Sequence, residues 1–324
     1  MKNKNIKFLK NSMYDPKRDA INKRELRNLE DEEHDLPRKK KSLGQHFLRK
    51  QSVVDNMISS VTITPETSVM EIGCGDGFLT QAILNQTRCK QLTCFEIDPE
   101  WVEFVKNKIK DPRLTIVLEN ILTVSLEPLY KTKPLVLLAN LPYQITFPIM
   151  FMLQKDKALF QEGVVMVQEE VAQKIVSSRG KTYGPTSMFL QYHFTFKLLE
   201  KIEPGSFSPP PKVHSRLIHF KPKLEVTPIK DEENFWKFLK TCFQFPRRTL
   251  RNNIKATNFL HHESLTETLL DLRAQQLSFE QFLVVWDKIS PDLKTAVPGQ
   301  ASCKAWESNS DDTKTSLDML KLTK

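Results

Sequence analysis

The chain has 324 residues, of which 40% are hydrophobic and 27% are charged, and its formal net charge is +9. This length favours one large domain or two unequal domains with a sizeable core, and no apolar run approaches the ~18 residues that a transmembrane helix needs. The first ten residues lack the apolar core of a secretory signal. We therefore expect a cytoplasmic protein without a membrane segment.

The basic charge is not spread evenly along the chain. Residues 1–42 hold 13 Lys and Arg against 8 Asp and Glu, residues 291–324 hold five of each kind, and about +4 is left for the middle. A basic balance favours a polyanionic partner such as nucleic acid. Because the middle of the chain carries only about +4, the overall charge supports such a partner weakly. Residues 1–37 and 291–324 contain few large apolar side chains, so we expect both segments to be disordered.

Five cysteines are present, but none forms a Cys-x-x-Cys pair and no histidine cluster stands near them. In a cytoplasmic chain this pattern favours reduced thiols. We therefore expect neither a disulfide nor a metal site.

Strand-like apolar runs alternate with helical patterns between these tails. We expect strands at 68–72, 91–96, 114–118, 135–139 and 164–167, with helices at 79–84 and 101–109 between the first three. The alternation predicts an α/β fold with a doubly wound, Rossmann-like parallel sheet. Residues 193–202 and 216–220 are expected to close the sheet as an antiparallel pair, and residues 232–289 have a wholly helical pattern. We predict a sheet domain at 38–224 and a small helical domain at 225–290.

A glycine-rich turn follows the first expected strand, from Glu71 to Gly77. Its glycines, beginning at Gly73, have the spacing G-x-G-x-G and allow a tight turn with close approach to a ligand. A dinucleotide site would have G-x-G-x-x-G, and the acids Glu71 and Asp76 would repel a pyrophosphate. Acids suit a cofactor that carries an amino group and a sulfonium cation, so the turn favours S-adenosylmethionine.

Polar residues follow the next two strands and extend this site. Glu96 stands 25 residues after Glu71, where a carboxylate accepts hydrogen bonds from the two ribose hydroxyls. Asp98 is interpreted as the cap of the following helix. Asn120 is a candidate acceptor for the amino group of the cofactor's adenine, with a simple turn residue as the alternative interpretation.

The fourth strand leads into Asn140, Leu141, Pro142 and Tyr143. The exocyclic nitrogen of adenine is a poor nucleophile, because its lone pair is delocalised into the ring. The Asn140 side-chain carbonyl and the Leu141 backbone carbonyl are suited to accept its two N–H groups, and Pro142 stiffens the turn. Tyr143 is suited to stack on the base. This motif predicts an amino-directed methyltransferase that works by positioning rather than by a strong general base.

A base that enters such a pocket must be unstacked or single-stranded, and a second aromatic wall would hold it. Phe207, in a loop stiffened by the three prolines at 209–211, is the candidate for this wall. A core position for Phe207 is the alternative interpretation.

Five motifs together resemble the small-subunit ribosomal RNA adenine dimethyltransferase family, of the KsgA type. They span residues 41–48, 71–77, 140–143, 207–215 and 247–253, and the resemblance covers residues 38–290. It implies a class I methyltransferase fold and dimethylation of two adjacent adenines near the 3′ end of small-subunit rRNA during subunit assembly. We expect the protein to act on the assembling subunit as a monomer.

The resemblance also implies roles for single residues. Gln45, His46 and Leu48 would close over the cofactor from the amino-terminal side. Cofactor contacts carry over onto Gly73, Glu96 and Asn140, and base contacts onto Leu141, Tyr143 and Phe207. The chain departs from the family at Asn120, where Asp is usual, and at Pro246, where Arg is frequent.

Two basic clusters are candidates for RNA contacts. One contains Lys40 and Lys41, and the other contains Arg247, Arg248 and Arg251. Spacings of one and four residues would place the three arginines on one helical face, which the resemblance implies would grip the RNA backbone. A solvated charged surface is the alternative interpretation.

Three other functions compete with this one. A large-subunit rRNA adenine dimethyltransferase of the macrolide-resistance type usually has Asn-Ile-Pro-Tyr and tends to lack the three-proline run. A non-catalytic assembly factor on the same fold would not need Asn140 and Tyr143. A dinucleotide oxidoreductase would need a different glycine spacing.

Overall fold

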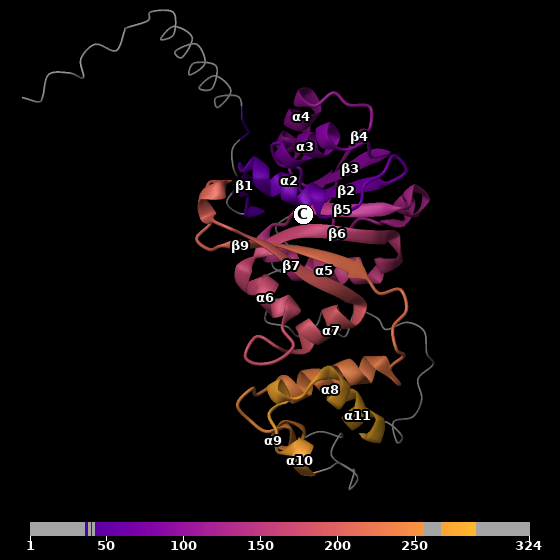
Figure 1. Cartoon of the computed structure of the whole chain (residues 1–324), viewed down its shortest axis with the longest axis vertical. Helices are drawn as coiled ribbons and strands as arrows, with labels where there is room; N and C mark the ends of the chain where they lie inside the picture. The colour runs from indigo at the N-terminus through magenta and orange to yellow at the C-terminus, as the bar shows by residue number, and fades with distance from the viewer. Residues whose placement is uncertain (1–35, 38–39, 41–42, 256–266, 290–324) are drawn as a thin grey trace, which may run out of the picture. The chain divides into compact units, whose positions relative to one another are not determined.

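The computed structural model describes residues 36–37, 40, 43–255 and 267–289 (Figure 1). Apart from residues 36 and 37, the tails that we expect to be disordered lie outside the described residues, as does Lys41. The description that follows concerns the compact unit that begins at Lys40. Within the described ranges, no helix is long and apolar enough to cross a membrane.

A seven-stranded sheet forms the centre of this unit, in the order β4-β3-β2-β5-β6-β9-β7 (Figure 1). The strands in this order are Leu114–Leu118, Gln91–Glu96, Ser68–Ile72, Leu135–Asn140, Phe160–Gln168, Ser215–Pro222 and Phe194–Ile202. The first five are parallel, and β9 is antiparallel to both β6 and β7. The predicted doubly wound α/β fold and its antiparallel closing pair are confirmed.

Both faces of the sheet are covered by helices, and β5 shows why its sequence is continuously apolar. Leu135, Leu137 and Ala139 belong to one buried hydrophobic cluster, and Val136 and Leu138 belong to another. Successive side chains of a strand point to opposite faces, so a strand between two helix layers is apolar at every position. The first cluster contains side chains of α5 Thr146–Lys155, α6 Glu169–Val176 and α7 Pro185–His193, and the second contains side chains of α2 Gln51–Ser59, α3 Phe78–Gln86 and α4 Pro99–Lys108.

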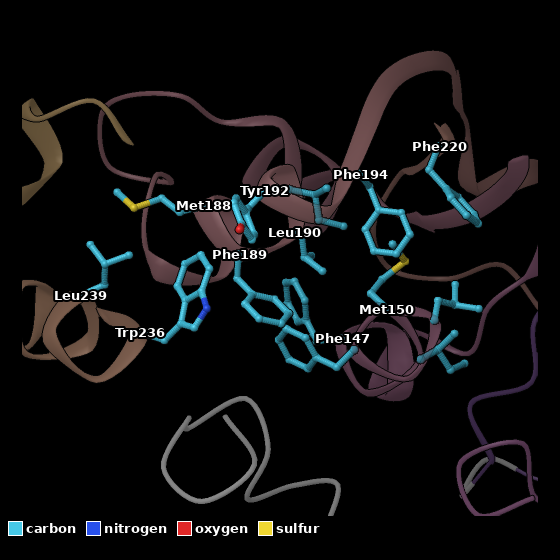
Figure 2. Packing of buried hydrophobic residues seen from close by; sticks show 14 of the residues in the cluster. Phe147, Met150, Met188, Phe189, Leu190, Tyr192, Phe194, Phe220, Trp236 and Leu239 are labelled. Atoms are coloured by element: carbon cyan, nitrogen blue, oxygen red, sulfur yellow. The ribbon is translucent and has the colours of Figure 1, made fainter. Parts of the chain in front are cut away.

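The predicted helical segment after the sheet is confirmed in its described part. It contains α8 Glu232–Phe243, α9 Leu250–Ile254, α10 Glu267–Leu270 and α11 Phe279–Ile289. Trp236 of α8 packs edge-on against Phe189 of α7, with ring centroids 5.1 Å apart (Figure 2). The helical segment therefore shares one hydrophobic cluster with the sheet's own helices, and its status as a separate domain stays a prediction.

A second, two-stranded sheet links two distant segments. β1 Phe47–Leu48 pairs antiparallel with β8 Phe207–Ser208. Each strand has only two residues, too few for a periodic pattern, so the sequence did not predict this pairing. It joins residues 43–49, which we call the strap, to the loop that contains the three prolines.

Candidate active site

A cavity of about 190 Å³ opens beside the carboxyl ends of the parallel strands. The strand order reverses between β2 and β5, which is where open α/β sheets bind ligands. The cavity brings together most of the residues predicted for the site: Gln45, His46, Leu48, Gly73, Glu96, Asn120, Asn140, Leu141 and Tyr143. Phe207 and the basic residues are not among its lining residues.

The glycine turn leaves open space at Gly73 and none at Gly75. Gly73 and Gly75 have φ values of +76° and +51°, in the left-handed region that favours glycine. A Cβ atom at Gly75 would lie 2.7 Å from the Phe47 ring, whereas a Cβ atom at Gly73 would meet nothing within 4 Å. Gly73 lines the cavity, so its missing side chain leaves space for a ligand against the backbone.

The Glu96 carboxylate is buried at the end of β3 and is held in one orientation. Its two oxygens accept backbone N–H groups from Gly75 at 3.1 Å, Ile97 at 2.9 Å and Asp98 at 3.0 Å. Burial raises the pKa of Glu96, and these hydrogen bonds oppose that increase. The Cys74 thiol lies 4.0 Å from the same carboxylate, so four donors face its roughly four acceptor sites. A ligand hydroxyl would take the place of this long thiol contact. Asp98 caps α4 by accepting the Glu100 N–H at 3.2 Å, as predicted.

Asn120 lines the cavity and also forms a turn. Its side-chain oxygen accepts the Leu122 N–H at 3.0 Å. Both interpretations of this residue fit its surroundings, because an amide oxygen has two lone pairs and the turn uses one of them.

The two acids of the glycine turn are less available than the sequence suggested. Glu71 is 1% exposed and accepts hydrogen bonds from the Thr80 hydroxyl at 2.7 Å and the Cys94 thiol at 3.1 Å. Burial raises the pKa of Glu71 to about 7. Asp76 forms an ion pair with Arg49 of the strap. The charge beside the turn is therefore partly suppressed at Glu71 and partly balanced at Asp76.

The Asn140 side chain has a fixed orientation at the end of β5. Its Nδ2 atom donates a hydrogen bond to the backbone carbonyl of His46 at 2.9 Å. An amide has a donor end and an acceptor end, so this bond leaves the Asn140 oxygen available as an acceptor. The adjacent Leu141 carbonyl receives no hydrogen bond from any residue that the structure describes.

Tyr143 is held from two sides. Its hydroxyl lies 2.6 Å from the hydroxyl of Ser215, at the start of β9, and its ring stacks on the His46 ring with centroids 5.8 Å apart. His46 is fixed in turn, because its Nδ1 atom lies 2.8 Å from the Pro209 carbonyl. The sequence had assigned His46 to the cofactor and had given Ser215 no role, because neither contact is visible in a linear pattern.

Phe207 is placed differently from the aromatic wall that the sequence predicted. Its side chain is 5% exposed and belongs to a hydrophobic cluster with Leu48, Ile202 and Leu217. The pairing of β8 with β1 accounts for this position. In this structure the Phe207 ring is part of the core, and His46 is the ring that stacks on Tyr143.

Lys40 belongs to the site and was predicted to contact RNA. Its ammonium group lies 2.8 Å from Asp98 and 3.1 Å from Glu100, and its backbone N–H donates to the Gln45 side chain at 2.7 Å. Gln45 also donates to Asp98 at 3.3 Å. Through these contacts Lys40 links Gln45 of the strap to Asp98 and Glu100 beside the cavity.

The predicted helical face of three arginines is wrong. Arg247 and Arg248 lie in the turn before α9, which begins at Leu250 after the Thr249 cap. Arg251 is on the helix, and its Nε atom lies 3.2 Å from Asp271. Threonine is a strong N-cap residue, and with Thr249 as the cap the helix begins at Leu250, three residues after Arg247.

Comparison with known proteins agrees with this geometry. The sequence profile of the family described as "Ribosomal RNA adenine dimethylase" matches residues 37–290. The chain belongs to this family. The "Ribosomal RNA small subunit methyltransferase A" of Chlorobium phaeobacteroides is 34% identical over 253 residues, which cover 78% of this chain and 91% of the relative. The protein of that name from Mesomycoplasma hyopneumoniae is 37% identical over 67% of this chain and 82% of its own length.

A solved structure shows the same fold. The crystal structure of a dimethyladenosine transferase from Plasmodium falciparum matches with a TM-score of 0.61 and 23% identity, over 74% of this chain and 96% of that chain. The predicted family, enzyme class and methyl donor, S-adenosylmethionine, are confirmed. Open space at Gly73 and the buried acceptor Glu96 beside it fit this cofactor, and the family match excludes the dinucleotide alternative.

We expect Glu71→Gln to remove a pH dependence of stability. A carboxyl with a higher pKa in the folded state stabilises the fold fully below its ordinary pKa of 4.5, and that contribution is lost as pH rises through about 7. Between pH 5 and pH 8 the variant should therefore gain about 2–3 kcal/mol relative to the parent chain. Denaturant unfolding at both pH values measures the difference, with Glu103→Gln on an exposed face of α4 as the control. A constant difference between parent and Glu71→Gln would contradict this account.

Proposed function

We propose that this enzyme transfers methyl groups from S-adenosylmethionine to the N6 atoms of two adjacent adenines near the 3′ end of small-subunit rRNA, on the assembling small subunit. The names of the relatives from Chlorobium phaeobacteroides and Mesomycoplasma hyopneumoniae support the small subunit as substrate. The proposal includes action as a monomer in the cytoplasm and gives no role to a metal ion.

The observation that carries the proposal is the orientation of the Asn140 amide. The Asn140 Nδ2 atom donates a hydrogen bond to the His46 carbonyl at 2.9 Å. The Asn140 side-chain oxygen is therefore left as an acceptor, and with the neighbouring Leu141 carbonyl it forms a pair of acceptors beside Tyr143. Two acceptors match the two N–H groups of an exocyclic adenine amine. An amine held in this way has its lone pair directed out of the plane of the base, where a methyl group can be received in line.

The rate enhancement then comes mainly from position and preorganised dipoles. The two carbonyl oxygens stabilise the positive charge that develops on the nitrogen, and they are already aimed before the base arrives. Tyr143 supplies a flat surface for the base, and its contacts with Ser215 and His46 fix the plane of that surface. The proposal requires no strong general base.

Residues at the other end of the cavity would bind the methyl donor, whose sulfonium supplies the methyl group. Glu96 is suited to accept the ribose hydroxyls, and Asn120 is suited to contact the adenine. Gly73 admits the ligand against its backbone. Gln45, His46 and Leu48 would cover it from the strap, and Lys40 would hold the strap through Asp98.

Two other functions remain as outcomes of the test. Methylation of a large-subunit adenine would need the same acceptor pair, and the three-proline run and the segment at 247–253 favour the small subunit instead. A non-catalytic assembly factor would have no use for an oriented Asn140 amide.

Unmethylated small subunits incubated with labelled S-adenosylmethionine test the proposal directly. The parent chain should label two adjacent adenines near the 3′ end of the rRNA, and Asn140→Ala should reduce transfer by at least about a hundredfold, because one acceptor and its preorganised dipole are lost. Mapping of the modified nucleosides measures both results, and circular dichroism checks the fold. Label on a large-subunit adenine, or near-normal turnover by Asn140→Ala, would refute the proposal.

Asn120→Asp should tighten cofactor binding roughly fivefold, because a carboxylate keeps the Leu122 hydrogen bond and adds a charged acceptor. Calorimetric titration with S-adenosylmethionine measures the affinity. Asn107→Asp adds the same charge on an exposed face of α4 and serves as the control. Equal or weaker binding by Asn120→Asp would show that the residue at this position does not contact an amino group of the cofactor.

Ser215→Ala should slow methyl transfer about tenfold without changing cofactor affinity, because the Tyr143 ring loses its support. In a Tyr143→Phe background the same substitution should have little further effect, since the hydroxyl that Ser215 contacts is absent. Single-turnover transfer rates for the four proteins give the coupling between the two residues. Additive losses would mean that Ser215 acts through something other than Tyr143.

A further inference from the structure

A large aromatic side chain is exposed between α8 and α9. Phe245 is 43% exposed, and the guanidinium group of Arg248 lies over its ring at 4.2 Å from the centroid. Arg247, one residue before Arg248, is also exposed. Burying a phenylalanine contributes about 1.5–3 kcal/mol, so a ring left in water is available for contact with a partner.

The turn that presents Phe245 is held by one buried side chain. Asn253, which is 5% exposed, accepts the Phe245 N–H at 3.0 Å and donates to the carbonyls of Phe245 at 3.2 Å and Thr249 at 3.3 Å. The Arg248 N–H also donates to the Phe245 carbonyl, at 2.9 Å, and Pro246 restricts the backbone between them. Phe245 is therefore presented on a preorganised turn.

The charges around the ring indicate the chemistry of the partner. Among the described residues, no carboxylate lies within ion-pair distance of Arg247 or Arg248, whereas Arg251 on the adjacent helix is paired with Asp271. Two exposed cations beside a flat aromatic surface match a phosphate backbone with an accessible base. Bases stack on aromatic side chains without regard to sequence, because each base has a π face.

We propose that Phe245, Arg247 and Arg248 form a stacking platform for one unpaired base of the RNA substrate. The inference rests on the proposed function for the identity of the RNA, and it adds a contact separate from the residues that line the active-site cavity. Phe245 would stack on the base, and the two arginines would contact the flanking phosphates. The affinity of the platform for RNA then has two components. Stacking on Phe245 requires an unpaired base, and the phosphate contacts of the two arginines weaken as the salt concentration rises.

Two RNA probes with equal numbers of phosphates separate these components: a hairpin whose loop holds unpaired adenines, and a fully paired duplex. Phe245→Ala should weaken hairpin binding about tenfold at every salt concentration and leave duplex binding unchanged. Arg247→Ala with Arg248→Ala should weaken both and reduce the slope of log affinity against log salt by about two. Phe245→Tyr should bind like the parent chain.

Tyr130→Ala is the matched control, because Tyr130 is also an exposed aromatic with a cation, Lys133, over its ring, and it should change neither affinity. Phe245→Trp provides a direct readout of stacking, since its fluorescence should be quenched by the hairpin more than by the duplex, relative to the parent chain. Equal effects of Phe245→Ala on both probes, or none on either, would overturn the platform. A loss of binding seen only with assembled subunits would indicate a protein contact and would also overturn it.

These outcomes are separable from failure of the proposed function. The proposed function fails if the parent chain does not label the expected adenines. The platform fails if the probes do not distinguish Phe245→Ala from Phe245→Tyr, whichever adenines are labelled.

Discussion

The hydrogen bond from the Asn140 amide to the His46 carbonyl, at 2.9 Å, is the interaction on which the rest of the site depends. It joins the end of β5 to the strap, and it fixes which end of the Asn140 amide is left free beside the cavity. Because a carbonyl can only accept, the bond permits one orientation of Asn140. The strap therefore supplies the atom that orients Asn140.

The strap is held mainly by packing, with charge in a supporting role. Lys40, before the strap, pairs with Asp98 after β3, and Arg49, the last residue of the strap, pairs with Asp76 in the glycine turn. Partly exposed ion pairs contribute only about 0–1 kcal/mol each. The larger contributions come from Phe47, which packs on Trp101 with ring centroids 4.7 Å apart, and from the pairing of β1 with β8. The Phe47 ring also occupies the space beside Gly75 that any side chain would need. The glycine is thus required by the strap as well as by the turn.

The parts of this molecule that could be predicted from the sequence are those with a repeating pattern. Continuous apolar runs predicted the parallel strands, and the polar residues at their carboxyl ends, such as Glu96 and Asn140, were correctly expected to converge. The errors lie where a contact joins segments far apart in the chain. Phe207 entered the core because it pairs with Leu48, and Arg247 left the expected helix because Thr249 caps it. Neither outcome follows from the spacing of residues in the sequence. The Thr249 cap sets the start of the helix regardless of the arginine spacing, and a two-residue strand is too short to show an alternating pattern.

The same division separates the residues proposed to bind the cofactor from those proposed to bind the base. The glycine turn and Glu96 lie at the ends of regular strands, in the part of the cavity that we propose binds the cofactor. The groups suited to a base come from irregular segments that meet only in the fold: His46 reaches Pro209 across 163 positions, and Tyr143 reaches Ser215 across 72. Each of these bonds closes a long loop, so ordering the acceptor site costs more conformational entropy than ordering the turn. The proline run reduces that cost, because prolines restrict the loop already in the unfolded chain. Phe207 holds the same loop in the folded state, through the pairing of β8 with β1 and its packing in the core.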